Sequence, residues 1–356
     1  MDVKWSIEND LYGIVESTAD VWESLRHASF FITGGTGFIG TWLLETLKLA
    51  NEHLNLALTA TILTRDRNRF SNRAPHLVTY PAFTFINGDV QTFVSPKGHF
   101  THVIHAATDT RYTLCESDPK QIFDTIVNGT HRVLDFVVEK RCEKVLYLSS
   151  GAVYGPQPDG LDKISENYIG SLDFSNPRYC YSEGKRAAEM LCGIYEKQFS
   201  VEFVVARIFA LVGPHLPLDE HYAIGNFIRN AIDHHAIVVN GNGSPVRSYL
   251  YIADLIEWLC KLLTAGKPGV KYNVGSEEAI SIRSLAEIVA RTLGNGGFET
   301  RGETEMGINP GRYIPDTTLI RSELGVHEKV TLQQSILRTA LWNGWYGSTG
   351  DLLQKN

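Results

Sequence analysis

A short glycine-rich loop between an apolar run and a helix-like segment constrains the fold of this chain more than any other feature. The run at positions 30–33 is Phe-Phe-Ile-Thr, which is typical of a buried parallel strand, and a helix-like segment follows from Thr41. Between them the spacing G-x-x-G-x-x-G gives Gly34, Gly37 and Gly40. A helix N-terminus carries unpaired N–H groups and the positive end of the helix dipole, so a pyrophosphate binds there if no side chains intervene. The loop therefore predicts a dinucleotide-binding site, with a purely structural turn as the alternative.

The alternation of strand-like and helix-like segments predicts the fold class. We expect further strands at 58–64, 83–90, 101–107 and 144–150, and a long helix with a wide apolar face at 119–140. Four βα units without internal repeats predict an α/β fold with a doubly wound, Rossmann-type parallel sheet.

The segment 1–28 precedes the first strand. Its apolar residues are spaced for one or two amphipathic helices with a break near Ser17. We favour a packing extension over a substrate lid for this segment.

Composition limits the partners and the compartment. The 356 residues carry 33 Lys and Arg against 40 Asp and Glu, and this net charge of -7 argues against a general nucleic-acid binder. The sequence has no apolar run of transmembrane length and no signal-peptide order at its start, so we expect a cytoplasmic protein without a membrane partner. Its five cysteines lack C-x-x-C spacing, which predicts reduced thiols and no structural metal site.

The end of the strand 58–64 bears on the choice of cofactor. An NAD site usually places Asp or Glu there to bind the adenosine ribose, but this chain has Thr64 followed by Arg65. A guanidinium pairs with a 2′-phosphate, whereas a carboxylate would repel it. We therefore predict NADP(H), with NAD(H) as the alternative if the arginines form a solvated turn and Asp66 binds the ribose.

Small or polar residues end the next two strands. Asp89 follows one strand and is placed to bond an adenine amino group, and Ala106 and Ala107 end the other, where small side chains let a flat ligand approach. His105 precedes these alanines. We interpret it as a packed strand-end residue without a catalytic role.

A tyrosine and a lysine four residues apart are the candidates for acid–base chemistry. Tyr181 and Lys185 share one face of a predicted helix at 180–198, and a nearby ammonium stabilises a phenolate and lowers the tyrosine pKa. A serine from a neighbouring strand end helps to hold a reacting hydroxyl or carbonyl. The pair alone is weak evidence, since it also occurs by chance on exposed helices.

Together with the glycine loop and the strand end Ser-Ser-Gly-Ala-Val-Tyr-Gly, this pair resembles the extended short-chain dehydrogenase/reductase family, in its nucleotide-sugar branch of epimerases, dehydratases, decarboxylases and ketoreductases. The resemblance extends from Phe30 to about Gly325. It implies that Tyr181 donates or accepts the proton, that Lys185 holds the nicotinamide ribose and tunes the tyrosine, and that Ser150 is the third catalytic residue. The cofactor contacts that it implies are Gly34, Thr36, Gly37, Phe38, Ile39, Gly40, Thr64, Arg65, Asp89, Val90, His105, Ala106 and Ala107, together with Tyr181 and Lys185.

The same resemblance implies a nucleotide-diphosphate sugar as substrate. Arg247 and Arg312 match two arginines that grip the diphosphate, with surface salt bridges as the alternative. Asn226 and Phe227 are weaker candidates for the nucleotide pocket. Ser150 and Gly151 complete the expected substrate contacts, and Ala210 replaces an asparagine that the family usually has in its Arg-x-Phe-Asn stretch.

A missing acid narrows the expected reaction. The dehydratases and decarboxylases of this family keep an acidic residue just before Val-Tyr-Gly, where this chain has Gly151 and Ala152, neither of which transfers a proton. We therefore predict NADPH-dependent reduction of a 4-keto-6-deoxy nucleotide sugar. A 4-epimerase that retains its cofactor is the alternative, and a dehydratase, a decarboxylase or a non-catalytic NADP-binding protein is less favoured.

The expected architecture has two unequal lobes. A cofactor domain at 29–212, to which 248–264 returns, follows the extension at 1–28, and 213–356 mainly forms a smaller α/β lobe for the nucleotide sugar. By resemblance, the helices 119–140 and 180–198 pair across a two-fold axis in a homodimer.

Overall fold

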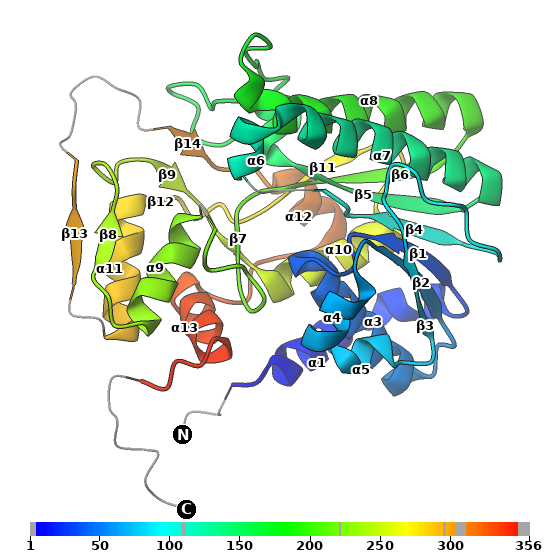
Figure 1. Cartoon of the computed structure of the whole chain (residues 1–356), viewed down its shortest axis with the longest axis horizontal. Coiled ribbons are helices and arrows are strands. Elements are labelled where there is room, and N and C mark those ends of the chain that lie inside the picture. The colour runs from blue at the N-terminus through cyan, green and yellow to red at the C-terminus, as the bar shows by residue number, and fades with distance from the viewer. Residues whose placement is uncertain (1–4, 109–111, 221, 295–296, 303–310, 348–356) are drawn as a thin grey trace, which may run out of the picture.

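The fold is built on a seven-stranded parallel sheet (Figure 1). It is seen in a computed structural model that describes residues 5–108, 112–220, 222–294, 297–302 and 311–347. The strand order is β11-β6-β5-β4-β1-β2-β3, so the chain reverses direction across the sheet between β1 and β4. This order confirms the predicted doubly wound sheet and places a topological switch point at the carboxyl ends of β1 and β4. The strands are β1 (Ser29–Thr33), β2 (Thr59–Thr64), β3 (Phe83–Asn87), β4 (His102–His105), β5 (Lys144–Ser150), β6 (Glu202–Ile208) and β11 (Lys271–Val274).

Two strands of the sheet, β3 and β4, differ from their predicted bounds at the carboxyl end. β3 ends at Asn87 because the following residues turn, and the carboxylate of Asp89 accepts a hydrogen bond from the N–H of Gln91 at 2.9 Å. β4 ends at His105, two residues earlier than predicted. Both differences shorten the strands and leave the predicted ligand-binding residues in loops above the sheet.

Helices cover both faces of this sheet (Figure 1). One face carries α7 (Pro119–Lys140) and α8 (Cys180–Phe199), which pack side by side. The other face carries α3 (Phe38–Leu54) and α10 (Ile252–Ala265). Successive side chains of β1 enter the two different cores, with Phe31 on the α7–α8 side and Ile32 on the α3–α10 side. A strand that is buried on both faces has a continuous apolar sequence, and this is why the strand could be predicted from the sequence.

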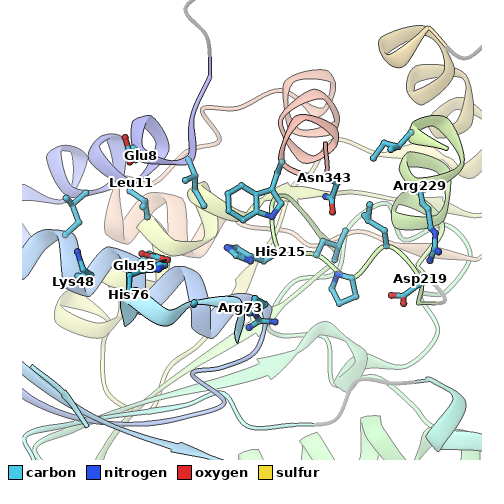
Figure 2. Close-up of a pocket in the computed structure, with 18 of the residues that line it drawn as sticks. Glu8, Leu11, Glu45, Lys48, Arg73, His76, His215, Asp219, Arg229 and Asn343 are labelled. Atoms are coloured by element: carbon cyan, nitrogen blue, oxygen red, sulfur yellow. Dashed lines mark hydrogen bonds and ion pairs between the residues drawn. The ribbon is translucent and has the colours of Figure 1, made fainter. Parts of the chain in front are cut away.

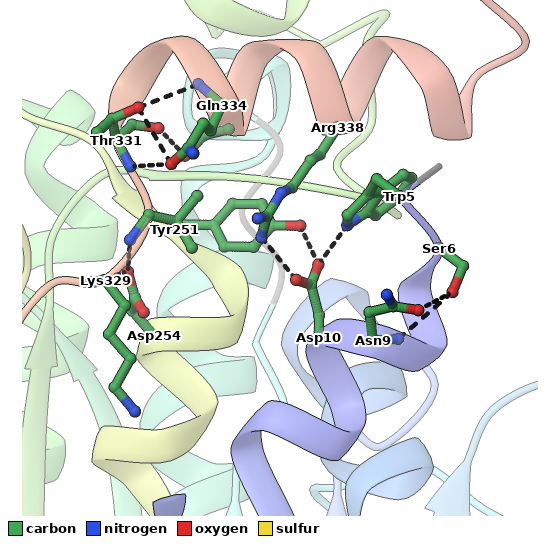
Figure 3. A network of polar contacts seen from close by, with 12 residues as sticks. Trp5, Ser6, Asn9, Asp10, Tyr251, Asp254, Lys329, Thr331, Gln334 and Arg338 are labelled. Atoms are coloured by element: carbon green, nitrogen blue, oxygen red, sulfur yellow. Dashed lines mark hydrogen bonds and ion pairs between the residues drawn. The ribbon is translucent and has the colours of Figure 1, made fainter. Parts of the chain in front are cut away.

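The N-terminal extension forms α1 (Ile7–Ser17) and α2 (Ala19–Trp22), with a break at Thr18 as predicted. Asp10 docks the extension on the rest of the chain (Figure 3). Its carboxylate accepts hydrogen bonds from Trp5 at 2.9 Å, from the Tyr251 hydroxyl at 2.5 Å and from Arg338 at 2.6 Å. Burial raises the pKa of Asp10, and these donors oppose the rise. The described residues of the extension therefore pack against α3 and α10, and Asp10 also joins them to the helix that carries Arg338.

A second, smaller lobe has its own core, to which Ile228, Leu285 and Ile336 contribute. It contains α9 (Ala223–Ile232), α11 (Ile282–Leu293), α13 (Leu332–Trp342), β8 (Ile237–Val239), β9 (Val246–Arg247), β12 (Ile280–Ser281), β13 (Phe298–Thr300) and β14 (Arg312–Tyr313). The remaining elements are η1 (Glu23–Leu25), α4 (Arg67–Arg73), α5 (Pro75–Val78), α6 (Tyr112–Ser117), η2 (Gly151–Tyr154), η3 (Pro177–Tyr179), β7 (Leu211–Val212), β10 (Leu250–Tyr251) and α12 (Thr318–Leu324).

Two segments within 213–356, the range expected to form mainly the smaller lobe, pack with the large sheet. β11 pairs with β6 as the seventh parallel strand, and Tyr272 and Val274 are buried in the main core. α12 packs on β11 and buries Ile320 in the same core. The range 213–356 therefore contributes to both the large sheet and the smaller lobe, because β11, which lies far along the chain, pairs with the edge of β6.

Of the helices in the described ranges, none combines the length and the apolar composition needed to cross a bilayer. The five cysteines are free thiols. Among the described residues no group of three or more His, Cys, Asp and Glu side chains is arranged to hold a metal ion.

Candidate functional site

The three glycines of the loop after β1 differ in how closely other atoms surround them. A β-carbon on Gly34 would lie 2.5 Å from the backbone of Ala106, and one on Gly40 would lie 2.2 Å from the Gly34 carbonyl oxygen. These two glycines let the loop close on itself and on β4. A β-carbon on Gly37 would meet only the Gly34 oxygen, at 3.3 Å, within 4 Å. Gly37 precedes α3, and no side chain of the N-cap residue pairs with the first N–H groups of that helix, an arrangement that fits a pyrophosphate.

The adenosine end of the predicted cofactor site lies where β2 meets the glycine loop. The hydroxyl oxygens of Thr36 and Thr64 are 3.4 Å apart. The carboxylate of Asp66 caps α4 by accepting the N–H of Arg69 at 2.9 Å, so this acid is engaged locally. Arg65 is exposed to solvent.

Arg73 is a basic residue at this end that the sequence analysis did not single out. It lies at the C-terminus of α4, and its Nη2 donates to the carbonyl oxygen of Thr36 at 2.5 Å and to the Thr41 hydroxyl at 3.0 Å. The contact brings a guanidinium onto the glycine loop itself. The several arginines that follow β2 in the sequence indicate a basic residue at this site. Which of them contacts the glycine loop depends on the orientation of α4 in the folded chain.

The residues after β3 and β4 lie around the switch point. Val90 is buried and contacts Gly129 of α7, where a β-carbon would lie 2.8 Å from Val90 Cγ1. Ala106 and Ala107 follow β4, and the N–H of Ala107 donates to the Thr33 hydroxyl at 3.2 Å. This arrangement keeps the predicted adenine and nicotinamide positions at the carboxyl edge of the sheet.

His105 is a packed residue at the end of β4. Its Nδ1 lies 2.7 Å from the Thr33 hydroxyl and its Nε2 lies 3.0 Å from the Thr130 hydroxyl, so both ring nitrogens are occupied. Burial, together with the nearby charge of Lys185, lowers the pKa of His105 to about 3. The ring is therefore neutral at neutral pH and fully hydrogen-bonded, which leaves no ring nitrogen for the cofactor.

The three predicted catalytic residues lie together at the carboxyl end of β5. Ser150 ends the strand, and its side chain is hydrogen-bonded to the hydroxyl of Tyr181 on α8. Lys185, one turn further along α8, is 2% exposed, and its Nζ donates to the carbonyl oxygen of Leu148 at 2.8 Å. The same Nζ lies 6.0 Å from the centre of the Tyr181 ring. The helical spacing of four residues thus brings the ammonium and the phenol to one site, as predicted.

Burial shifts the pKa values of both groups. Burial lowers the pKa of Lys185 to about 7, and the negative charge of Glu189 opposes this shift. Burial also raises the pKa of Tyr181, while the hydrogen bond to Ser150 opposes the rise. The phenol therefore holds its proton at neutral pH, which is the form that a general acid needs.

Tyr313 and Phe209 complete this site, and the sequence analysis missed both. The side chain of Tyr313, on β14 of the smaller lobe, is hydrogen-bonded to Ser150, and its ring centre lies 4.5 Å from that of Phe209. A β-carbon on Gly151 would lie 2.6 Å from Phe209 Cε2 and 2.7 Å from the Tyr313 hydroxyl. The space in which a side chain at position 151 would stand is therefore already filled.

Arg247 and Arg312 lie on neighbouring strands of the smaller lobe. In the parallel pairing of β9 with β14, Arg247 stands opposite Tyr313, and Arg312 stands opposite Val246. Successive strand residues point to opposite faces, so Arg247 shares the face of Tyr313 and Arg312 leaves from the other face. Arg247 Nη1 donates to the carbonyl oxygens of Val246 at 2.9 Å and Gly311 at 3.0 Å. This differs from the expectation that both guanidinium groups point at one diphosphate.

The two weaker nucleotide candidates are on α9. Phe227 is 4% exposed and packs in the core of the smaller lobe, so its ring is a packing element. Asn226 is half-buried, and its N–H donates to the carbonyl oxygen of Tyr222 at 3.1 Å.

A cavity of about 960 Å³ lies between α1, α3, α9 and α13, and Arg73 is one of the residues that line it (Figure 2). Its wall contains both signs of charge, and several of its charged groups pair with one another. Glu45 lies 2.7 Å from His76, and Arg229 lies 3.6 Å from Asp233. None of the three predicted catalytic residues lines it, so we do not assign it to the site.

Comparison with known proteins agrees with this geometry. The profile of the NAD dependent epimerase/dehydratase family matches residues 30–275. UDP-glucuronic acid decarboxylase 1 of Xenopus tropicalis is 29% identical over 309 residues, which cover 86% of this chain and 70% of the relative.

Two solved structures show the same fold. A dTDP-glucose 4,6-dehydratase of Streptomyces venezuelae with NAD bound has a TM-score of 0.75 at 24% identity, over 88% of this chain and 96% of that one. UDP-glucuronic acid 4-epimerase of Bacillus cereus in complex with NAD has a TM-score of 0.73 at 20% identity, over 88% and 96%. The chain therefore belongs to the NAD-dependent epimerase/dehydratase family, a family of enzymes within the extended short-chain dehydrogenase/reductase group.

Proposed function

We propose that this chain is an NADPH-dependent ketoreductase that reduces the 4-keto group of a nucleotide-diphosphate sugar, with a 4-keto-6-deoxy sugar as substrate. One observation supports this reaction above others of the family. Ser150, Tyr181 and Lys185 are assembled for proton transfer to a carbonyl oxygen, while Phe209 and Tyr313 fill the space beside Gly151.

The missing acidic side chain argues against elimination or decarboxylation. By family resemblance those reactions use an acidic side chain just before Val-Tyr-Gly, where this chain has Gly151 and Ala152. Neither residue transfers a proton. The relatives named as UDP-glucuronic acid decarboxylases therefore suggest the nucleotide-sugar class of substrate, and we do not carry their reaction over to this chain.

The chain's own residues supply the proton and hold the reacting oxygen. A nicotinamide bound at the switch point supplies hydride to the keto carbon. Tyr181 donates its phenolic proton to the oxygen, so that the C=O group becomes CH–OH. Ser150 donates a hydrogen bond to the same oxygen, and the Lys185 ammonium stabilises the phenolate that Tyr181 leaves.

Three features support NADPH over NADH. Thr64 stands where an acid would repel a 2′-phosphate, and the carboxylate of Asp66 is engaged in capping α4. The Arg73 guanidinium contacts Thr36 of the glycine loop. A guanidinium in this position forms charge-assisted hydrogen bonds with a phosphate.

A 4-epimerase with a retained cofactor is the second candidate. The same three catalytic residues, without an acid at position 151 or 152, also serve transient oxidation at C4 and return of the hydride to the opposite face. The NAD bound in the related 4-epimerase fold keeps this candidate open.

We further propose two features of the assembly. Arg247, on the face of β9 shared with Tyr313, binds the substrate diphosphate. Arg312, on the opposite face, is the second candidate for binding that diphosphate. A homodimer forms through α7 and α8. Their outer faces expose Phe123, Met190, Ile194 and Phe199.

The test of the reaction follows the absorbance of reduced nicotinamide. The purified chain is mixed with NADPH or NADH and with UDP-, dTDP-, GDP- and CDP-linked 4-keto-6-deoxy sugars, and Tyr181→Phe serves as the inactive control. Stoichiometric loss of NADPH with one of these sugars supports the ketoreductase. If NADPH is not consumed, the corresponding 4-hydroxy nucleotide sugars are tested without added cofactor. Inversion at C4, together with nicotinamide bound in the purified chain, would establish the epimerase instead.

A further inference from the structure

A buried ion pair lies one helical turn from the predicted catalytic residue Lys185. Glu189 follows Lys185 by one turn of α8, and its carboxylate pairs with the guanidinium of Arg207 on β6. Arg207 Nε donates to Glu189 Oε1 at 3.0 Å, and Arg207 Nη2 donates to Oε2 at 2.6 Å. Glu189 is 7% exposed and Arg207 is 9% exposed.

The same carboxylate is tied to the strand that carries Ser150. The hydroxyl of Ser149, the preceding residue, donates to Glu189 Oε1 at 2.6 Å. On the other side of the pair, Arg207 Nη1 donates to the Tyr154 hydroxyl at 2.7 Å, and that hydroxyl donates to Asn273 Oδ1 at 2.7 Å. One carboxylate therefore connects α8 with the carboxyl ends of β5 and β6, where the catalytic residues meet.

Stability alone does not account for this pair. Removing two charges from water is costly, and a buried ion pair is often no more stabilising than apolar residues of the same size. Its connection to both catalytic elements points to a role in the reaction.

Among the described residues, the groups that act on Lys185 include one that is negative at neutral pH. His105 approaches from β4 and Tyr147 from β5, and both are neutral at neutral pH because burial lowers the pKa of the first and raises the pKa of the second. On α8, burial likewise raises the pKa of Tyr181 and of the Cys192 thiol. Of the groups of the described residues that act on Lys185, Glu189 is the one whose charge favours the ammonium form at neutral pH.

We propose that Glu189 is a positioning residue for the reaction. It fixes the end of β5 and the inner face of α8 through Ser149 and Arg207, and its charge holds Lys185 in the ammonium form beside Tyr181. This role rests on the proposed use of Tyr181 and Lys185 in proton transfer.

The direct test measures the titration of Lys185 in the protein without added ligand. Lysine is labelled with ¹³C at the ε-carbon, and the Lys185 signal is identified by its loss in Lys185→Met. We expect a midpoint of about 7 in the wild type. Glu189→Gln should lower the midpoint by about one pH unit, since it removes the opposite charge one helical turn away.

Activity against pH provides the second readout. In Glu189→Gln the loss of activity on the alkaline side should shift downward by the same amount, and Glu189→Asp, which keeps the charge, should restore the wild-type profile. Tyr195→Phe is the matched control, because it removes a 2.5 Å hydrogen bond from Tyr195 on the same helix to Asp135, on α7. It should leave both the titration and the profile unchanged.

The outcomes separate this proposal from the proposed function. A Lys185 midpoint that is unchanged in Glu189→Gln, with activity reduced equally at all pH values, would overturn the proposal. If no nucleotide sugar is turned over, the proposed function fails, and the NMR titration still decides the role of Glu189.

If Glu189→Gln does not fold, the double variant Glu189→Gln/Arg207→Gln is used, because it leaves no unpaired buried charge. Its Lys185 midpoint should also lie below that of the wild type, and an equal midpoint would contradict the proposal.

Discussion

The Tyr313 hydroxyl lies 2.7 Å from the point where a β-carbon of residue 151 would stand. Gly151 begins η2 directly after β5, and Tyr313 lies on β14 of the smaller lobe. The same tyrosine is hydrogen-bonded to Ser150. The hydroxyl of Tyr313 therefore occupies the space that a side chain at position 151 would need, and glycine at this position makes room for it.

A β-carbon at position 151 should destabilise the fold. Gly151→Ala places a methyl group within 2.7 Å of both Phe209 and Tyr313. Overpacking of this kind costs about 1–3 kcal/mol in the free energy of unfolding, which urea denaturation measures. Gly193→Ala is the control, since its β-carbon on α8 meets nothing within 4 Å and alanine favours a helix. Equal stabilities of the two variants would contradict the packing described here.

The hydroxyl of Tyr313 should contribute to turnover. Tyr313→Phe keeps the ring against Phe209 and removes the hydrogen bond to Ser150. We expect kcat to fall about 10-fold, the equivalent of one hydrogen bond, with little change in the unfolding midpoint. Steady-state kinetics on the accepted nucleotide sugar measures this change. An unchanged kcat would mean that Tyr313 acts only as packing.

Arg73 should select between the two nicotinamide cofactors. Arg73→Ala removes the guanidinium that contacts Thr36, and we expect the Kd for NADPH to rise by roughly 10-fold while the Kd for NADH changes little. Isothermal titration calorimetry with each cofactor measures both constants. Arg67→Ala is the matched control, because Arg67 is exposed on the same helix. A parallel loss of both cofactors in Arg73→Ala would assign the residue to the loop and not to the 2′-phosphate.

Lys185 should make stability depend on pH. The free side chain releases its proton near 10.5, whereas burial lowers the pKa of the folded Lys185 to about 7. Between these values the unfolded chain binds the extra proton, so the free energy of unfolding rises with pH. Compared with Lys185→Met, the wild type should gain up to about 1.4 kcal/mol per pH unit in this window. Urea unfolding at several pH values measures the difference, and parallel curves would show that Lys185 is not buried in this way.

The outer face of α8 should carry the dimer. Met190 is 66% exposed and Ile194 is 40% exposed on the helix that packs beside α7. A Met190→Lys/Ile194→Lys double variant should sediment as a monomer at concentrations at which the wild type is a dimer, because two charges would be buried in the interface. Ile169→Lys is the control, since Ile169 is an exposed apolar residue outside both helices. Dissociation in the control, or a dimeric double variant, would place the interface elsewhere.

The sequence predicted the parts of this structure that depend on local pattern. The strand Lys144–Ser150 and the helix Pro119–Lys140 have the predicted bounds, because an apolar run and a 3.6-residue period are visible without tertiary contacts. The spacing of Tyr181 and Lys185 was sufficient to place them on one helical face.

The missed features depend on segments that meet only in the folded chain. Tyr313 reaches Ser150 through the pairing of β14 with β9, and Arg207 reaches Glu189 through the packing of α8 on β6. β11 was missed because its four residues complete the edge of a sheet built much earlier in the chain. The opposite faces of Arg247 and Arg312 likewise follow from a strand register that no single segment defines.

Transfer of deuterium tests the central claim most directly. The chain is incubated with the accepted 4-keto nucleotide sugar and NADPH deuterated at C4 of the nicotinamide, in separate reactions for the two faces, and the product is examined by NMR. The proposed reduction predicts deuterium at C4 of the sugar from one of the two cofactors, with one NADPH consumed per product. Absence of deuterium from the sugar with either cofactor, with NADPH unconsumed, would contradict the reductase. Inversion at C4 of the corresponding 4-hydroxy nucleotide sugar, without added cofactor, would then identify a 4-epimerase.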